Sequence, residues 1–173
     1  PDLNAWLKQK ETESNQIYES LIGDRSPLSF IASIFFMAFL PAIAEEIFFR
    51  GFLMNVFNGI FNNMHVAILV TAFIFSTMHL QFMKFVPMFF LATVFGYAVY
   101  WTGSLFTSIL AHFINNSLAV IQLFYFSDGD YSKSLEQSQT LGLPFNIMLI
   151  FLALFLFVLI QRKSSTKTTC FYV

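Results

Sequence analysis

The sequence predicts an all-α protein, a polytopic bundle of about five transmembrane helices, and three observations support this. The 173 residues are 57% hydrophobic, 19% aromatic and only 11% charged, whereas soluble domains carry about 25% charged residues. Five apolar stretches follow one another from residue 28 onward, each close to the roughly 20 residues that a helix needs to cross a bilayer. None of them shows the alternation of a barrel strand, and lipid-exposed spans must be helices or closed barrels.

The predicted elements divide the chain into three regions. Residues 1–27 are polar, and apolar side chains at helical spacing (Leu3, Trp6 and Leu7) favour an amphipathic segment at the membrane surface, with a solvated linker as the alternative. Residues 28–161 form the predicted transmembrane core, and residues 162–173 form a polar, flexible tail. The five apolar stretches are residues 28–57, 64–80, 85–101, 105–126 and 144–160.

The boundaries of the stretches follow from turn-forming residues. Pro41 lies inside the first stretch, where it predicts a kink or break. The sequence begins with Pro1, so we expect an N-terminally truncated core with upstream helices missing. The expected breaks between the stretches are Asn58-Gly59, Asn62-Asn63, residues 81–84, Thr102-Gly103-Ser104 and the loop 127–143.

Charge and cysteine content exclude several classes. The net charge of −1 gives no basis for binding nucleic acid, and the single Cys170 excludes an intrachain disulfide framework. The expected partner of the apolar surface is the lipid bilayer. The chain is therefore predicted to be a multi-pass integral membrane protein, in the cell membrane if the source is prokaryotic.

Residues 28–126 contain only four charged side chains, and three of them lie within six positions: Glu45, Glu46 and Arg50. The fourth, Lys84, lies in a predicted loop. A charge near the bilayer centre costs about 2.5–3.5 kcal/mol on insertion scales, so ionisable residues there point to function.

Helical spacing separates the two acids. Glu46 and Arg50 are four residues apart, with the acid first, which favours an ion pair. Glu45 points about 100° further round and has no such partner on its own helix, so it is a candidate general base. The structural alternative is an ion network that only holds helices together.

Two further helices carry polar groups. His79 lies four residues after Phe75, and His112 lies four residues before Asn116 on the same face. A histidine and an amide on one face can donate hydrogen bonds to one oxygen, as an oxyanion site needs. The alternatives are that His79 is a hydrogen-bonded packing histidine, and that His112 and Asn116 only make polar contacts between helices. At ~1.5 Å per residue, His79 lies about 22 Å and His112 about 10 Å from the start of its stretch. We expect both stretches to start on the same side of the membrane, which would place the two histidines at different depths.

The motifs "EEIFFRG", "FSTMH" and "HFINN", in this order, resemble the CAAX prenyl protease and bacteriocin-processing family, also called type II CAAX endopeptidases or the Abi family. The resemblance covers residues 28 to 122. It implies an intramembrane endopeptidase whose partners are protein or peptide substrates, with or without a prenyl group. Family members that act on prenylated proteins remove the last three residues after the lipidated cysteine.

The resemblance also implies roles for six residues. Glu45 would activate the hydrolytic water with help from His79, and Glu46 would support the site and pair with Arg50. His112 and Asn116 would stabilise the oxyanion. No cofactor is expected, although two histidines and a carboxylate leave a zinc-dependent protease as an alternative. A non-catalytic membrane protein, such as a transporter or bacteriocin-immunity factor, is the other alternative.

Overall fold

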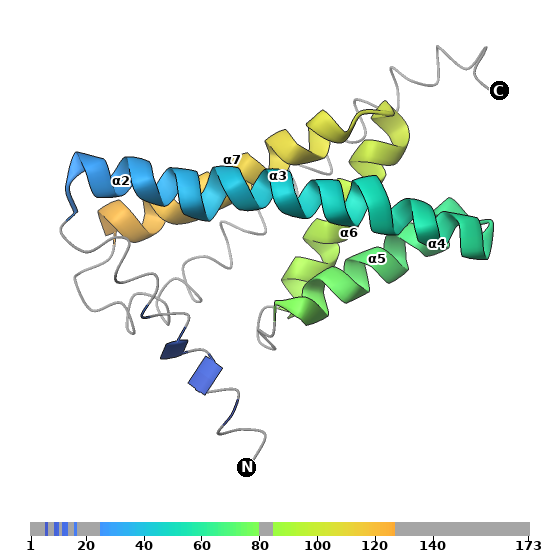
Figure 1. Ribbon diagram of the computed structural model, residues 1–173, viewed down its shortest axis with the longest axis horizontal. Coiled ribbons are helices and arrows are strands. Elements are labelled where there is room, and N and C mark those ends of the chain that lie inside the picture. The colour runs from blue at the N-terminus through green and yellow to red at the C-terminus, as the bar shows by residue number, and fades with distance from the viewer. Residues whose placement is uncertain are drawn as a thin grey trace.

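The computed structural model describes residues 25–79 and 85–126, together with residues 6, 9, 10, 12, 13 and 16. A single long helix runs from Pro27 to Phe61 and changes its winding along its length. Three more helices follow it (Figure 1). The segments are α2 (Pro27–Ser33), η1 (Ile34–Phe39), α3 (Leu40–Glu46), η2 (Ile47–Leu53), α4 (Met54–Phe61), α5 (Met64–Met78), α6 (Phe85–Thr102) and α7 (Leu105–Phe126).

The described residues confirm the predicted fold class. Three helices are long and apolar enough to cross a membrane, namely Pro27–Phe61, Phe85–Thr102 and Leu105–Tyr125. The apolar α5 is shorter, at 15 residues. The chain is thus a multi-pass integral membrane protein built from a helical bundle. The predicted stretch 144–160, the tail 162–173 and most of the segment 1–27 lie outside the described residues.

Two asparagines make the turn between α4 and α5. Asn62 has a left-handed backbone, with φ of 49°, and its N–H donates to the Asn58 carbonyl and closes α4. The side chain of Asn63 then accepts hydrogen bonds from the first backbone N–H groups of α5. The break predicted at Asn58-Gly59 is wrong, because α4 continues through both residues to Phe61.

Pro41 does not break the long helix. It lies in the first turn of α3, directly after the wider, π-helical η1. A proline inside a continuous helix removes one backbone hydrogen bond, and the change of winding occurs at this point. A second π-helical segment, η2, begins directly after Glu46. Segments of this winding are rare and are frequently found at functional sites.

α7 packs antiparallel along the long helix, as the contacts at three levels show. Gly51 faces Leu105, Met37 accepts a hydrogen bond from Asn116, and the Phe30 and Phe124 rings meet at 5.0 Å. α5 and α6 form an antiparallel pair, since Phe73 of α5 meets Phe85 at the start of α6 while Ile68 lies beside Gly96. Gly96 permits their close approach, since a Cβ there would lie 2.8 Å from Ile68.

The expected difference in depth between His79 and His112 is wrong, because α5 and α7 do not start at the same level. Leu105, at the start of α7, lies beside Gly51, whereas α4 continues for another ten residues to Phe61 before α5 begins. At ~1.5 Å per residue this offsets the two starts by about 15 Å. In Figure 1, α5 accordingly starts at the far end of α4. The offset brings His79 and His112 to the same depth.

Candidate active site

Glu46 is the centre of a buried ion network. Its side chain is fully buried, and its Oε1 accepts hydrogen bonds from Arg50 Nη1 at 2.6 Å and from His112 Nδ1 at 2.8 Å. The pair predicted from the i, i+4 spacing is therefore present. The contact with His112 joins α3 to α7 and was not predicted, because spacing along one helix says nothing about its neighbours.

Arg50 connects this network to two further helices. Its Nη2 donates to the backbone carbonyl of Ala92 on α6 at 3.0 Å. Its guanidinium lies 4.9 Å from the centre of the Phe75 ring and 5.7 Å from that of Phe95. Both rings attract the cation through their faces. Only Phe75 had a signal in the sequence, as the first residue of the "FSTMH" motif.

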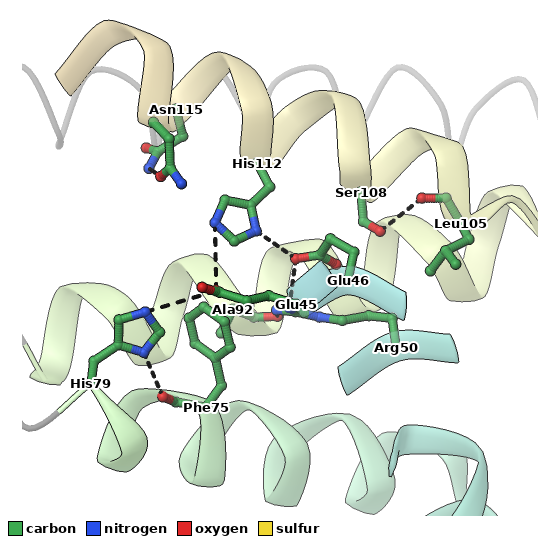
Figure 2. Close-up of polar contacts among 11 residues, drawn as sticks. Glu45, Glu46, Arg50, Phe75, His79, Ala92, Leu105, Ser108, His112 and Asn115 are labelled. Carbon is green, nitrogen blue, oxygen red and sulfur yellow. Dashed lines mark hydrogen bonds and ion pairs between the residues drawn. The ribbon is translucent and has the colours of Figure 1, made fainter. Parts of the chain in front are cut away.

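Glu45 lies in a different environment from Glu46. Its side chain is about one-third exposed, and its Oε2 lies 3.8 Å from Nε2 of His79 and 3.8 Å from Nε2 of His112. Figure 2 shows the carboxylate between the two rings. Both separations are too long for a direct hydrogen bond. Among the residues that the structure describes, Oε2 has no hydrogen-bond partner, although this oxygen itself is buried.

The partners of the two imidazole rings determine which nitrogen carries a hydrogen. His79 Nδ1 lies 2.8 Å from the Phe75 carbonyl oxygen, and His112 Nδ1 lies 2.8 Å from the Glu46 carboxylate. Both partners are acceptors, so each Nδ1 carries the hydrogen. In a neutral ring, Nε2 then presents a lone pair toward Glu45. Glu46 orients His112 as a carboxylate orients a catalytic histidine.

A cavity of about 310 Å³ opens beside Glu45. It is lined by an acid and a histidine, Glu45 and His79, together with two apolar side chains, Phe49 and Met78. Such a cavity can hold a water molecule and part of a peptide. The closed network around Glu46 thus lies next to an open site at Glu45.

Asn116 lies on the same helix as His112 but is engaged elsewhere. Its Nδ2 donates to the Met37 carbonyl at 3.4 Å, and its Oδ1 accepts from Asn115 at 3.3 Å. No hydrogen bond joins it to Glu45 or His79 within the described part of the chain. The structure therefore brings five of the six predicted residues into contact and leaves Asn116 one helical turn away.

The arrangement of the donor side chains bears on the zinc-dependent alternative. Within residues 25–79 and 85–126, no group of three or more His, Cys, Asp or Glu side chains is arranged so that it could hold a metal ion. The nearby guanidinium of Arg50 also opposes a second cation at this position.

Comparison with known proteins identifies the family of this chain. The model of the family described as type II CAAX prenyl endopeptidase Rce1-like matches residues 27–118, which is more than half of the chain and includes every residue of the site. The chain belongs to the Rce1-like family. The matched range begins at the first residue of α2 and ends within α7, so it coincides with the described bundle.

One curated relative of this Rce1-like protein is the uncharacterized protein YpbD of Bacillus subtilis (strain 168). It is 27% identical over 122 residues, which are 68% of this chain and 58% of YpbD. The Rce1-like chain thus matches less than two thirds of that relative's length. No solved structure gives a significant match.

Proposed function

We propose that this Rce1-like protein is an intramembrane endopeptidase that hydrolyses peptide bonds of membrane-associated or lipidated proteins with a glutamate-activated water. One observation carries the proposal: Glu45 Oε2 lies 3.8 Å from both His79 Nε2 and His112 Nε2, beside a cavity of about 310 Å³. These separations leave room for a reacting group that is held by all three atoms. Membership of the family favours carboxyl-terminal processing of the CAAX type.

In the proposed first step, a water molecule lies between Glu45 and His79. Glu45 takes a proton from the water while its oxygen bonds to the carbonyl carbon of the peptide. The electron pair of the C=O double bond moves to oxygen and forms an oxyanion. His79, held by the Phe75 carbonyl at 2.8 Å, positions the water through its Nε2 lone pair.

In the second step, the C–N bond breaks and the proton held by Glu45 passes to the leaving amine. We assign the stabilisation of the oxyanion to His112. Its Nδ1 hydrogen is already bound to Glu46, so Nε2 can donate only when the ring carries both hydrogens.

The charges of the cluster are consistent with this requirement. Two carboxylates and one guanidinium leave one negative charge in a largely buried site. One additional proton, shared between His112, His79 and Glu45, makes the cluster neutral. An uncompensated buried charge is costly in a medium of low dielectric constant.

The decisive experiment is peptide cleavage by the purified protein in detergent or lipid vesicles. The panel contains peptides ending in a prenylated cysteine and three further residues, each paired with its unprenylated form. We expect the wild type to cleave at least one member, and Glu45→Gln to reduce the rate by about 10²–10⁴-fold, the range for general bases. Glu13→Gln, which removes an exposed carboxylate far along the sequence from the site, is the control and should retain full activity.

Two outcomes would separate the alternatives. Cleavage that survives a strong chelator, with no metal in elemental analysis, supports the metal-free mechanism, whereas loss restored by zinc contradicts it. If the wild type cleaves no peptide of the panel, the endopeptidase proposal fails and a non-catalytic membrane protein becomes the better explanation.

A further inference from the structure

Helix α6 carries none of the three sequence motifs, yet two of its groups reach the site. The Ala92 carbonyl accepts a hydrogen bond from Arg50, and Phe95 lies three residues further along, on nearly the same face of the helix. The Phe95 side chain is buried, with 5% of its surface exposed. α6 therefore adds to the site an aromatic ring that no motif assigns.

The ring of Phe95 lies against both groups that donate hydrogen bonds to Glu46. The Arg50 guanidinium is 5.7 Å from its centre, and the centre of the His112 ring is 5.6 Å away. The planes of Phe95 and His112 are inclined by only 31°, which is closer to a stacked than to an edge-to-face arrangement. The face of an aromatic ring attracts a cation, so Phe95 favours positive charge on either neighbour.

The imidazole of His112 is held by Glu46 at one atom only. Its Nδ1 lies 2.8 Å from the carboxylate, and a single hydrogen bond leaves a ring free to tilt about the line that joins the two partners. Such a tilt would displace Nε2, which lies 3.8 Å from Glu45. Phe95 opposes the tilt from a nearly parallel plane, and Phe75 opposes it at 75° and 6.1 Å. Two rings at different angles thus fix the plane of the imidazole.

We propose that Phe95 is a positioning residue whose ring holds the His112 imidazole with Nε2 toward Glu45 and attracts the cation that forms when His112 carries both hydrogens. The inference rests on the proposed function, in which His112 stabilises the oxyanion in that form. Because Phe95 acts through His112, its loss should slow the chemical step and leave the binding of the peptide nearly unchanged.

The test compares two buried phenylalanines in the full chain, purified in detergent. Phe124 is 7% exposed, packs against Phe30 and Tyr125, and lies about three turns after His112 on α7. We expect Phe95→Leu to lower kcat at least about tenfold and to leave KM within about twofold, whereas Phe124→Leu should leave both within about twofold. Equal kinetics in the two variants would overturn the proposal.

Fluorinated phenylalanine at position 95 separates the charge effect from packing, because ring fluorines weaken the negative potential of the face and nearly keep its shape. We expect kcat to fall stepwise from one to three fluorines, to a total of about tenfold, and to stay constant for the same series at position 124. A constant kcat at position 95, or an equal fall at both positions, overturns the proposal. This series decides the kinetic question where Phe95→Leu does not fold.

Nuclear magnetic resonance supplies a readout that needs no activity. The chain has three histidines, so ¹³C-labelled histidine gives few signals, and His112→Gln assigns one of them. We expect the order parameter of the His112 Cε1–H bond to fall from that of a rigid group to that of a flexible one in Phe95→Leu, and to stay unchanged in Phe124→Leu. An unchanged value in Phe95→Leu would contradict the positioning role. If the wild type cleaves no peptide, the proposed function fails, and this measurement alone decides whether Phe95 holds the ring.

Discussion

Glu45 and Glu46 are neighbours in the sequence, yet they lie in two different parts of the site. Glu46 is fully buried and bound by Arg50 and His112. Glu45 is about one-third exposed, borders the cavity and approaches two histidines only to 3.8 Å. We propose that the closed part around Glu46 stabilises the bundle and that the open part around Glu45 carries out the chemistry. Adjacent residues of the same type can thus serve different purposes when a helix turns them toward different neighbours.

The largest effect is expected from a substitution that disrupts the closed part of the site. Arg50→Met should lower the free energy of unfolding by about 3–5 kcal/mol, because it leaves the buried Glu46 carboxylate without its cation. Thermal or denaturant unfolding in detergent measures the change. The control is Lys10→Met, which removes the exposed ion pair with Glu13 and should cost less than about 1 kcal/mol. Equal losses for both variants would show that the buried network does not stabilise the bundle.

The second prediction concerns the open part. His79→Ala should reduce the cleavage rate by about 10²-fold, since it removes the group that positions the water, while the melting temperature changes by only a few degrees. Its ring lies next to Phe75 but is about one-third exposed, so little buried packing is lost. A variant with normal kinetics would remove His79 from the mechanism.

The third prediction tests the packing between α5 and α6, which supports both parts of the site. Gly96→Ala places a methyl group 2.8 Å from the buried Ile68 and should cost about 1–2 kcal/mol of stability through overpacking between α5 and α6. Gly59 has no atom within 4 Å of the same position, so Gly59→Ala is the matched control. It should be neutral or slightly stabilising, because alanine favours helices over glycine. The reverse order of stabilities would contradict the packing described here.

The smallest effect is expected far from the site. His65 and Tyr97 are joined by a 3.0 Å hydrogen bond between α5 and α6, and His65 is exposed. Tyr97→Phe should therefore cost no more than about 1 kcal/mol and leave cleavage unchanged. A loss of activity in this variant would mean that the two ends of the α5–α6 pair are coupled, and that the open part of the site extends beyond its cavity.

Much of the fold could be predicted because apolar length and turn residues are local signals. Residues 105–126 were predicted as a helix and form α7, and Asn62-Asn63 ends one helix and begins the next. Asn58-Gly59 was wrongly predicted as a break. Asparagine and glycine favour turns, but they are also tolerated inside a helix whose packing against its neighbours continues past them. The winding of η1 and η2 has no clear signature in the sequence, since it depends on hydrogen bonds that slip by one residue.

The site shows the same division between local and distant information. Spacing along one helix predicted the pair of Glu46 with Arg50 and separated Glu45 from it. The contacts of Arg50 with the Ala92 carbonyl and of Asn116 with the Met37 carbonyl could not be predicted, because backbone acceptors exist at every position. The depth of His79 relative to His112 depended on how far α4 continues beyond the start of α7, and that contact between helices has no signal in the sequence.

The central claim is that the two acids perform different tasks, and a parallel comparison of Glu45→Gln and Glu46→Gln tests it most directly. Both substitutions keep the shape of the side chain and remove one charge. The measurement pairs kcat/KM for one cleaved peptide with the melting temperature of each variant. We expect Glu45→Gln to lose at least about 10²-fold in kcat/KM with nearly unchanged melting, and Glu46→Gln to lose both activity and stability. Equal melting losses in the two variants, or an active Glu45→Gln, would contradict the account.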